Sequence, residues 1–409
     1  MMHQPMNKQL RRRVAGVLLL FLLAAACQPG TGQVRDQVEE IVREVEEEFV
    51  PDGRLELFQV EVGEGLELEG VTTLADAKET LLRRLDSLGL AEGVTDRITV
   101  LPDPALGDTT WALVRVSVSN LRSRPGHSQE LTSQVLMGTP LRILMREGSW
   151  YRIRTPEGYI AWVDAGAVHP LDREGLDGWN DAERRMFAGD FGLLVESPGS
   201  ESVVSDISLG GIVRAGERSG DLVRARLPDG RAGWLPAEDL VPLGDLPSAQ
   251  APDGLPPAAS LIALARTFMG RPYLWGGTSA HGVDCSGFMK TVFYRHGVVL
   301  SRDANQQVLH GREISFAEGW QDLRPGDLLF FGRAATEERG ERVSHVGLYM
   351  GQGRFIHSAG SPARVTVNSL VESDPDYDEG LREILLHVRR IGEVDGEAGP
   401  WSVANHPWY

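Results

Sequence analysis

The sequence is poor in cysteine: its 409 residues include only Cys27 and Cys285. Two cysteines cannot supply the disulfide framework of a small secreted scaffold. No HExxH segment and no CxxC pair occurs, which argues against a metallopeptidase, and we expect neither metal nor cofactor. Basic residues are also too few to balance the acidic ones, 41 against 58, so the net charge of −17 makes nucleic acid an unsuitable partner.

The sequence has one marked apolar run, in "RRRVAGVLLLFLLAAACQPG" near its start. Three arginines, a short apolar stretch and small residues predict a secretory signal over residues 1–26. The small residues before Cys27 resemble a bacterial lipobox, although Ala24 stands where Leu is usual. That resemblance implies lipid on Cys27, a tether to a bacterial membrane and a place in the cell envelope. The alternative is a plain cleaved signal with an incidental cysteine.

The pattern of apolar residues over 27–107 predicts a small α/β module. An acidic helix with apolar residues at helical spacing begins near Val34, and a second helix covers Ala75 to Leu88. Around the second helix, alternating apolar residues from Leu55 to Val62 and the segment "RITVLP" predict strands. The order helix–strand–strand–helix–strand resembles the BON modules of envelope proteins, and a plain spacer domain is an equal alternative.

The middle of the chain contains an internal repeat. "YRIRTPEGYIAWVDAGAVHPL" aligns without a gap with "VRARLPDGRAGWLPAEDLVPL". Alternation around a Pro-acid-Gly turn predicts small all-β barrels, which resemble bacterial SH3-like domains and are placed at 108–172 and 188–244. Tyr159 of the first copy aligns with Arg231 of the second, so a role of this tyrosine would be special to the first barrel.

A Pro/Ala/Gly-rich linker at 245–258 precedes the last domain, where Cys285 lies in "GVDCSGFMKTVFYRHG". The apolar spacing after Cys285 predicts a helix that begins at this cysteine and that Gly297 can end. Unpaired N–H groups at a helix start stabilise a thiolate and can also receive an oxyanion. The pattern therefore indicates a nucleophile, whereas a buried structural cysteine is the alternative.

Two histidines lie in "RVSHVGLYMGQGRFIHSAG", which predicts two short strands around a glycine turn. His345 on the first strand would take the proton of the thiol, and His357 on the second would orient His345. One such histidine alone would more often be structural. Two of them after a cysteine at a helix start favour catalysis.

The segments "RPYLWGG", "GVDCSGF", "LSRDANQQ", "DLRPGDLLFF" and "SHVGLYMG…FIHSAG" together resemble the NlpC family of papain-like cysteine peptidases over 259–391. The predicted fold is thus multidomain α+β, with a papain-like domain after two barrels and a tail at 392–409. The resemblance implies a catalytic Cys285, His345 and His357. It also implies hydrolysis of the γ-D-glutamyl to L-diamino acid bond in peptidoglycan stem peptides, by a protein that we expect to be monomeric.

The order of barrels and peptidase resembles a subgroup that prefers peptides with a free N-terminal L-Ala. By that resemblance the substrate-binding residues are Tyr273, Trp275, Asp284, Ser286 and Asp303, joined by Glu130 and Tyr159 of the first barrel. A carboxylate such as Asp303 suits an ammonium, while a structural ion pair is the preferred interpretation of Arg302. The alternatives are a general hydrolase of intact murein, a non-enzymatic wall-binding lipoprotein, and amide or acyl transfer by the same Cys–His chemistry.

Overall fold

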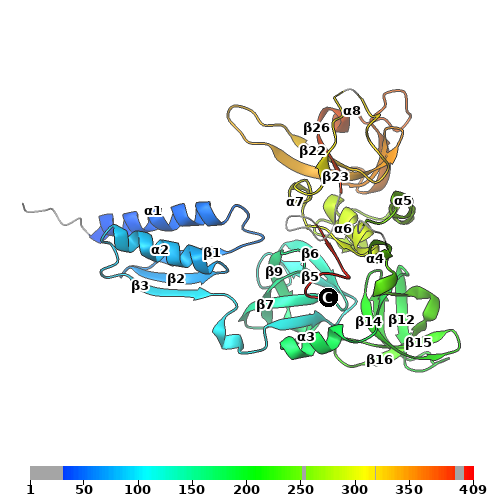
Figure 1. Cartoon of the computed structure of the whole chain (residues 1–409), viewed down its shortest axis with the longest axis horizontal. Helices are drawn as coiled ribbons and strands as arrows, with labels where there is room; N and C mark the ends of the chain where they lie inside the picture. Colours follow the sequence, from blue (N-terminus) through cyan, green and yellow to red (C-terminus); the bar gives the residue numbers. More distant parts are fainter. Residues whose placement is uncertain (1–30, 251–254, 318, 392–399) are drawn as a thin grey trace, which may run out of the picture.

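The structure is a computed structural model that describes residues 31–250, 255–317, 319–391 and 400–409. It consists of an N-terminal module, two barrels and a C-terminal domain (Figure 1), which confirms the multidomain α+β architecture. The predicted signal segment 1–26 and Cys27 lie outside the described residues, as do residues 392–399. No described helix is long and apolar enough to cross a membrane.

The N-terminal module has the predicted order of helices and strands. Its elements are α1 Thr31–Phe49, β1 Phe58–Val62, β2 Glu67–Thr72, α2 Ala75–Ser87 and β3 Thr95–Val100. β1 pairs antiparallel with β2, and β2 pairs parallel with β3. Val38, Val45, Leu68 and Leu81 belong to the core that the helices and the sheet share. The first strand begins later than Leu55 because residues 53–55 form a turn. The resemblance to BON modules stays a prediction.

The two barrels have the same strand order, which explains the internal repeat. The first contains β4 Trp111–Val114, β5 Val118–Arg122, β6 Leu131–Leu136, β7 Pro140–Glu147, β8 Trp150–Arg154, β9 Ile160–Asp164 and β10 Val168–Leu171. The second contains β11 Arg184–Phe187, β12 Phe191–Val195, β13 Val203–Ser208, β14 Ile212–Ser219, β15 Leu222–Arg226, β16 Ala232–Pro236 and β17 Leu240–Pro242. Their seven-stranded sheets follow β10-β4-β7-β8-β9-β5-β6 and β13-β12-β16-β15-β14-β11-β17, which match strand for strand when read in opposite directions.

The predicted start of the second barrel at 188 is too late. β11 pairs with both β14 and β17, so the barrel begins at Arg184. Helix α3 (Arg173–Asn180) lies between the two barrels in the chain, and short 3-10 helices occur at Pro104–Leu106, Ala165–Ala167, Ala237–Asp239 and Leu243–Asp245.

The barrels are joined by close backbone contacts. Gly138 has a positive φ, and a Cβ there would lie 2.3 Å from the carbonyl oxygen of Ile212, so only glycine fits this approach. The guanidinium of Arg231 donates to the backbone oxygen of Arg115 in the first barrel and to that of Val204 in its own. Arg231, the counterpart of Tyr159, thus links the two barrels.

The C-terminal domain packs helices against an antiparallel sheet. Its helices are α5 Ala258–Thr267, α6 Cys285–Arg295, α7 Ala304–Gln307 and α8 Glu379–Glu383, and α4 Pro247–Gln250 lies in the linker before them. Its strands are β18 Thr278–Ser279, β19 Gly282–Val283, β20 Val298–Val299, β21 Arg312–Glu313, β22 Leu328–Arg333, β23 Arg342–Gly351, β24 Arg354–Ala359, β25 Arg364–Ser369, β26 Leu385–Arg390 and β27 Trp401–Ser402. The main sheet has the order β21-β26-β22-β23-β24-β25, and α6 shares a core with it through Phe288, Val292, Val346 and Ile356.

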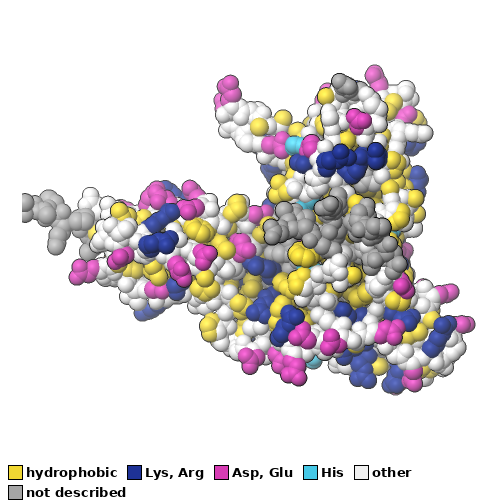
Figure 2. Space-filling model, viewed as in Figure 1, with side chains coloured by type: hydrophobic (Ala, Val, Ile, Leu, Met, Phe, Trp, Pro, Cys, Tyr) yellow, Lys and Arg dark blue, Asp and Glu magenta, His cyan; other side chains and the backbone are white. Residues whose placement is uncertain are grey.

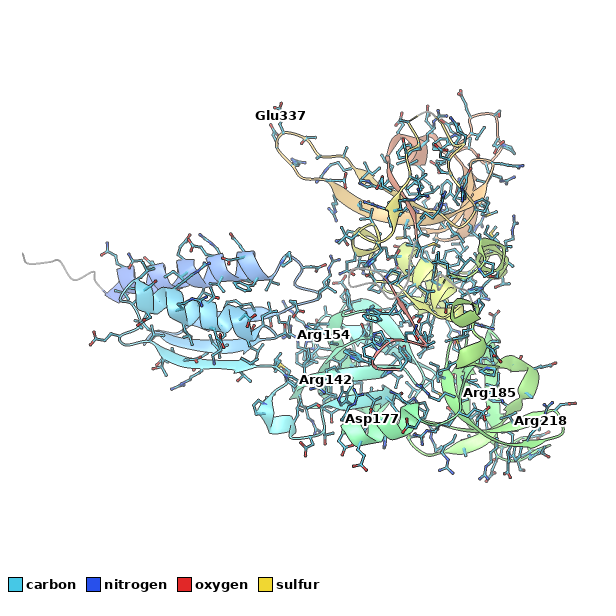
Figure 3. All side chains as sticks on the ribbon, in the orientation of Figure 1. Arg142, Arg154, Asp177, Arg185, Arg218 and Glu337 are labelled. Atoms are coloured by element: carbon cyan, nitrogen blue, oxygen red, sulfur yellow. The ribbon has the colours of Figure 1, made fainter. Side chains whose placement is uncertain are left out.

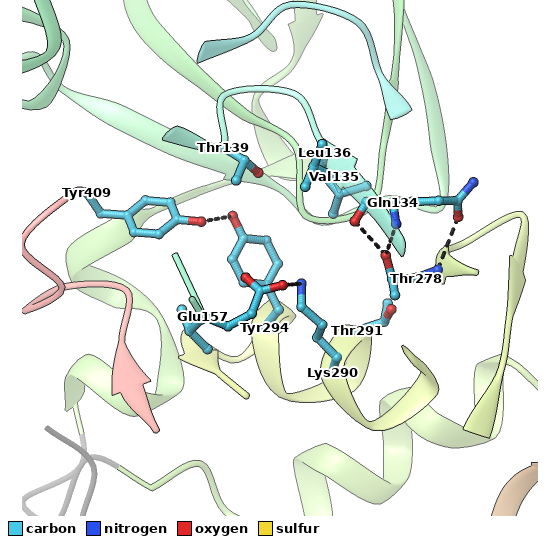
Figure 4. A pocket seen from close by; sticks show the side chains of 11 residues that line it. Gln134, Val135, Leu136, Thr139, Glu157, Thr278, Lys290, Thr291, Tyr294 and Tyr409 are labelled. Atoms are coloured by element: carbon cyan, nitrogen blue, oxygen red, sulfur yellow. Dashed lines mark hydrogen bonds and ion pairs between the residues drawn. The ribbon is translucent and has the colours of Figure 1, made fainter. Parts of the chain in front are cut away.

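The first barrel is fixed against α6 by buried polar contacts. Thr278 and Gln134 exchange three hydrogen bonds. Lys290 of α6 faces Glu157 of the barrel at 3.3 Å, both half-buried, beside a cavity of about 20 Å³ (Figure 4). The described part of the predicted tail, residues 400–409, packs here too: β27 pairs with β20, and the hydroxyls of Tyr409 and Tyr294 are 3.1 Å apart. The barrel therefore has a set position beside the start of α6.

Candidate active site

Cys285 is the first residue of α6, as the sequence predicts. Asp284 is the N-cap, and its carboxylate accepts a hydrogen bond of 2.7 Å from the backbone N–H of Gly287. A Cβ on Gly287 would lie 2.0 Å from the carbonyl oxygen of Gly277, so glycine allows the loop before α6 to pack against the first turn. Cys285 is a free thiol and only 8% exposed.

The thiol of Cys285 is protonated in the resting protein. Burial raises its pKa to about 12, the charge of Asp284 adds to the rise, and the backbone N–H groups of Ser286 and Val346 oppose it. The helix start thus favours the thiolate as expected, but desolvation outweighs it. A base must therefore remove the proton when the nucleophile acts.

His345 on β23 is placed to be that base. It directly precedes Val346, whose N–H contacts the thiol. Burial and the neighbouring His357 lower the pKa of His345 to about 3, so its ring is neutral in the resting protein. Nε2 of His345 lies 2.7 Å from Nδ1 of His357 on β24, which leaves Nδ1 of His345 for the thiol.

A third residue, Asn368 on β25, completes this chain of contacts. Its Oδ1 lies 2.9 Å from Nε2 of His357. Its Nδ2 faces two acceptors, the backbone oxygen of Asp376 at 3.4 Å and the carboxylate of Asp378 at 3.5 Å, which fixes the orientation of the amide. Nε2 of the neutral His357 must then donate to Asn368, so its Nδ1 accepts the proton of His345. Nδ1 of His345 is consequently unprotonated, which is the tautomer that a general base needs.

Tyr273 and Ser286 lie near the thiol, and Trp275 contacts the first barrel. Burial and then the nearby thiol of Cys285 raise the pKa of Tyr273 to about 12. Trp275 is 63% exposed, so it is not a core residue, and its Nε1 donates to the carboxylate of Glu130 at 2.9 Å. The hydroxyl of Ser286 accepts a hydrogen bond of 3.1 Å from Arg302. Glu130 thus links the first barrel to the loop that carries Trp275, and its role in binding substrate stays a prediction.

Asp284 was predicted to line the substrate site, but its carboxylate faces inward. It accepts hydrogen bonds from Gly276 N at 3.0 Å, from Gly287 N, and from Arg302 at 2.5 and 3.2 Å. Arg302 is 1% exposed and forms the predicted structural ion pair. This pair fixes the loop before Cys285, so the carboxylate of Asp284 has a structural task.

Asp303 and Tyr159 meet on the other side of Arg302. Burial raises the pKa of Asp303, and the charges of Arg302 and Arg54 oppose that rise. Tyr159 is buried, and its pKa is raised to about 12 by burial and then by the charge of Asp303. The structure thus brings these two predicted residues together, whereas Glu130 contacts Trp275.

Three residues of the site were not predicted. Asn368 lies in "RVTVNS", where it is a polar residue in an alternating strand beside that of His357. This alternation is the one signal that could have indicated it. Arg54 and Asp52 of the N-terminal module reach Asp303 and Gln306 of the C-terminal domain. No local sequence pattern predicts these contacts, because 249 residues separate Arg54 from Asp303.

Comparison with known proteins agrees with this architecture. A model of the NlpC/P60 family matches residues 270–377, and a model of the bacterial SH3 domain matches residues 117–169. The gamma-D-glutamyl-L-lysine dipeptidyl-peptidase of Bacillus cereus is 28% identical over 270 residues, 62% of this chain and 74% of that protein. The Bacillus subtilis protein of the same name is 40% identical over 116 residues, 28% of this chain and 37% of that protein. Dipeptidyl-peptidase 6 of Lysinibacillus sphaericus is 26% identical over 286 residues, 68% of this chain and 98% of that protein.

Two solved structures share the fold over much of the chain. An NlpC/P60 family protein from Bacillus cereus matches with a TM-score of 0.57 and 24% identity, over 68% of this chain and 99% of that one. An NlpC/P60 endopeptidase from Photobacterium damselae subsp. piscicida matches with a TM-score of 0.51 and 18% identity, over 70% and 72%. At these identities the comparison concerns the fold alone.

Proposed function

Because the chain carries an NlpC/P60 domain behind a bacterial SH3 domain, we propose that it is a cysteine peptidase of cell-wall peptides. The bond we assign is the γ-D-glutamyl to L-diamino acid bond of peptidoglycan stem peptides. The observation that carries the proposal is the position of Cys285 at the start of α6, with the N–H of Val346 on its thiol, together with the chain of contacts from His345 through His357 to Asn368. The names of the relatives from the two Bacillus species support the choice of bond.

The reaction follows from the geometry. Nδ1 of His345 takes the proton of Cys285, and the thiolate attacks the γ-carbonyl carbon of the glutamyl residue. N–H groups at the start of α6 receive the negative oxygen of the tetrahedral intermediate. The C–N bond breaks, His345 protonates the leaving amine, and the glutamyl group remains as a thioester on Cys285. Water, deprotonated by His345, then hydrolyses the thioester and restores the thiol.

We further assign a preference for fragments with a free N-terminal L-Ala. Asp303 supplies a carboxylate for the α-ammonium, Tyr159 lies beside it, and Glu130 with Trp275 forms the rim. A glycan-linked or acetylated stem peptide has no charge there and makes no ion pair with Asp303. The charge-assisted hydrogen bond that only the free amine forms contributes up to about 3 kcal/mol, enough for about a hundredfold discrimination.

The test compares kcat/KM for the tripeptide L-Ala-γ-D-Glu-diamino acid with that for its N-acetylated form, with product masses to identify the bond. We expect the free peptide to be cut about a hundredfold faster, and Asp303→Asn to remove much of this preference while Cys285 still reacts with iodoacetamide. Equal rates, or faster release from intact sacculi, would favour a general wall hydrolase. No hydrolysis at all would favour the non-enzymatic wall-binding protein.

The location of the protein in the cell is a separate part of the proposal. We place the mature protein in the envelope, attached to a membrane by lipid on Cys27, because of the residues that precede this cysteine. Cys27→Ser should give an exported protein that partitions into the aqueous phase of a detergent extraction. A wild-type protein that takes up no labelled fatty acid would refute the lipid anchor.

A further inference from the structure

A turn of the N-terminal module reaches into the proposed amine-binding site. Nη1 of Arg54 lies 2.6 Å from Oδ2 of Asp303 and 3.2 Å from Oδ1 of Asn305. Nε and Nη2 of Arg54 bind the carboxylate of Asp52 at 2.8 and 2.7 Å, and Asp52 accepts a further hydrogen bond from Gln306. The guanidinium therefore bridges a carboxylate of the module and a carboxylate of the peptidase domain.

The backbone of this turn is held firmly against the first barrel. The carbonyl oxygen of Arg54 accepts a hydrogen bond of 2.7 Å from the N–H of Ile160, the residue after Tyr159. Arg154, labelled at the junction in Figure 3, donates to the carbonyl oxygen of Leu55 and pairs with Glu56. A small apolar cluster of Leu57, Leu101, Leu144 and Ile160 lies beneath. The N-terminal module thus extends sideways from the barrel but is anchored at this end (Figure 1).

The side chain of Arg54 is less confined than its backbone. It is 38% exposed, so its guanidinium can rotate toward solvent while the turn stays in place. No change in the docking of the module is needed for such a rotation.

The charges around Asp303 leave little room for another cation. Its Oδ2 is paired with Arg54, and its Oδ1 lies 3.6 Å from Arg302, which is buried and already committed to Asp284. An ammonium that approaches Asp303 meets two guanidinium groups, and of these only Arg54 can move away. Rotation of Arg54 would free Oδ2 of Asp303 for another cation.

We propose that Arg54 is an internal competitor for the amine-binding site: its guanidinium occupies Asp303 until the α-ammonium of a substrate replaces it. The inference rests on the proposed function, because it concerns the same carboxylate and the same free amine. It assigns to the N-terminal module a role in specificity, since only peptides that carry a cation at this position can take over the contact.

The expected cost of this competition is modest. An exposed ion pair shifts a binding equilibrium by up to about fivefold. Asp52 also binds the guanidinium of Arg54, so we expect the competition to weaken substrate binding by about threefold to tenfold. The apparent affinity falls by the fraction of molecules in which the site is free. The competitor should therefore raise KM for free-amine peptides and leave kcat nearly unchanged.

The test is the variant Arg54→Ala in the full-length protein, assayed with the free and the N-acetylated tripeptide. We expect kcat/KM for the free peptide to rise about threefold to tenfold through a lower KM, and no rise for the acetylated peptide. Arg54→Lys, which keeps the positive charge, should rise less than Arg54→Ala. The matched control is Gln59→Ala, which removes a contact between the module and Arg152 of the barrel but does not touch Asp303. It should behave as the wild type.

Each other outcome counts against the proposal. A fall in kcat/KM for the free peptide would mean that Arg54 binds substrate, and equal gains for both peptides would mean that it merely blocks access. No change would mean that the contact with Asp303 has no effect on binding. A wild type with free-amine preference but an unresponsive Arg54 variant refutes the competitor alone, whereas a wild type that cuts neither peptide refutes the proposed function with it.

Discussion

Nε2 of His345 lies 2.7 Å from Nδ1 of His357, and the proton between them belongs to His345. The direction follows from Asn368, whose oxygen accepts the only proton of the neutral His357 ring. Two neutral histidines in series therefore hold the base in one tautomer. A neutral ring stands where a Ser-His-Asp triad has a carboxylate, so the base has no charged partner in the resting protein.

Loss of the nucleophile should abolish hydrolysis without unfolding the protein. Cys285→Ala removes one small side chain at the end of a helix whose cap, Asp284, remains. We expect kcat for the tripeptide to fall below detection and the melting temperature to stay within a few degrees. Substantial activity in this variant would contradict cysteine catalysis.

The three residues behind the thiol should differ in effect. His345→Ala removes the base and should lower kcat by about 10²–10⁴-fold. His357→Gln and Asn368→Leu should lower it less, roughly tenfold to a hundredfold, because these groups orient the base without replacing it. Arg364→Leu is the control, since Arg364 is an exposed residue of β25 that pairs with Ala359 and not with His357. If Asn368→Leu behaves like this control, the amide has no part in fixing the tautomer.

Acid should destabilise the protein partly through His345. Its folded pKa of about 3 lies below the unfolded value of about 6.5, so between these values the unfolded chain binds a proton that the folded one does not. The contribution of His345 to the free energy of unfolding is fully present above pH 6.5 and is lost as the pH falls toward 3. Melting temperatures of wild type and His345→Ala, measured from pH 7 to 4, should converge. Parallel curves would mean that the ring is not held neutral.

The buried pair of Arg302 and Asp284 should be sensitive to the loss of one partner. Arg302→Met leaves a buried carboxylate without its cation and should cost about 3–5 kcal/mol of unfolding free energy. The double variant Arg302→Met with Asp284→Asn removes both charges and keeps a capping side chain, so it should recover part of that loss. Urea unfolding of both variants decides this. Equal losses would mean that the cost comes from packing.

Local patterns were enough to predict the elements that carry the proposed nucleophile and base. The helix start at Cys285 and the two strands with His345 and His357 each depend on fewer than twenty neighbouring residues, and the structure has them as predicted. The repeat likewise predicted two barrels, because identical turn chemistry recurs in both copies.

Features that depend on pairing between distant segments were missed. The strand Arg184–Phe187 joins the second barrel only through partners that follow it in the chain, so the repeat could not show where that barrel begins. The inward orientation of Asp284 depends on Arg302, and the contact of Arg54 with Asp303 depends on how the domains dock. In each case the contact joins segments that lie far apart in the sequence, and neither segment has a local pattern that predicts its partner.

The surface gives no further hint of these contacts, since acidic and basic side chains are interspersed over the N-terminal module and the barrels (Figure 2). A charge pattern of this kind supports solubility but does not select one docking geometry. The docking depends instead on the few buried contacts beneath the turn of residues 53–55.

The link that Arg231 makes to the backbone of Arg115 has an evolutionary consequence. Two duplicated barrels began with equivalent positions after the Pro-acid-Gly turn, and these positions have since diverged. The first barrel has Tyr159 beside Asp303, while the second has Arg231, which donates a hydrogen bond to the first barrel. Repetition of the barrel thus lets one position serve rigid attachment to a neighbour in one copy and, in our proposal, contact with the substrate in the other. Exchange of the two side chains should therefore damage both tasks at once.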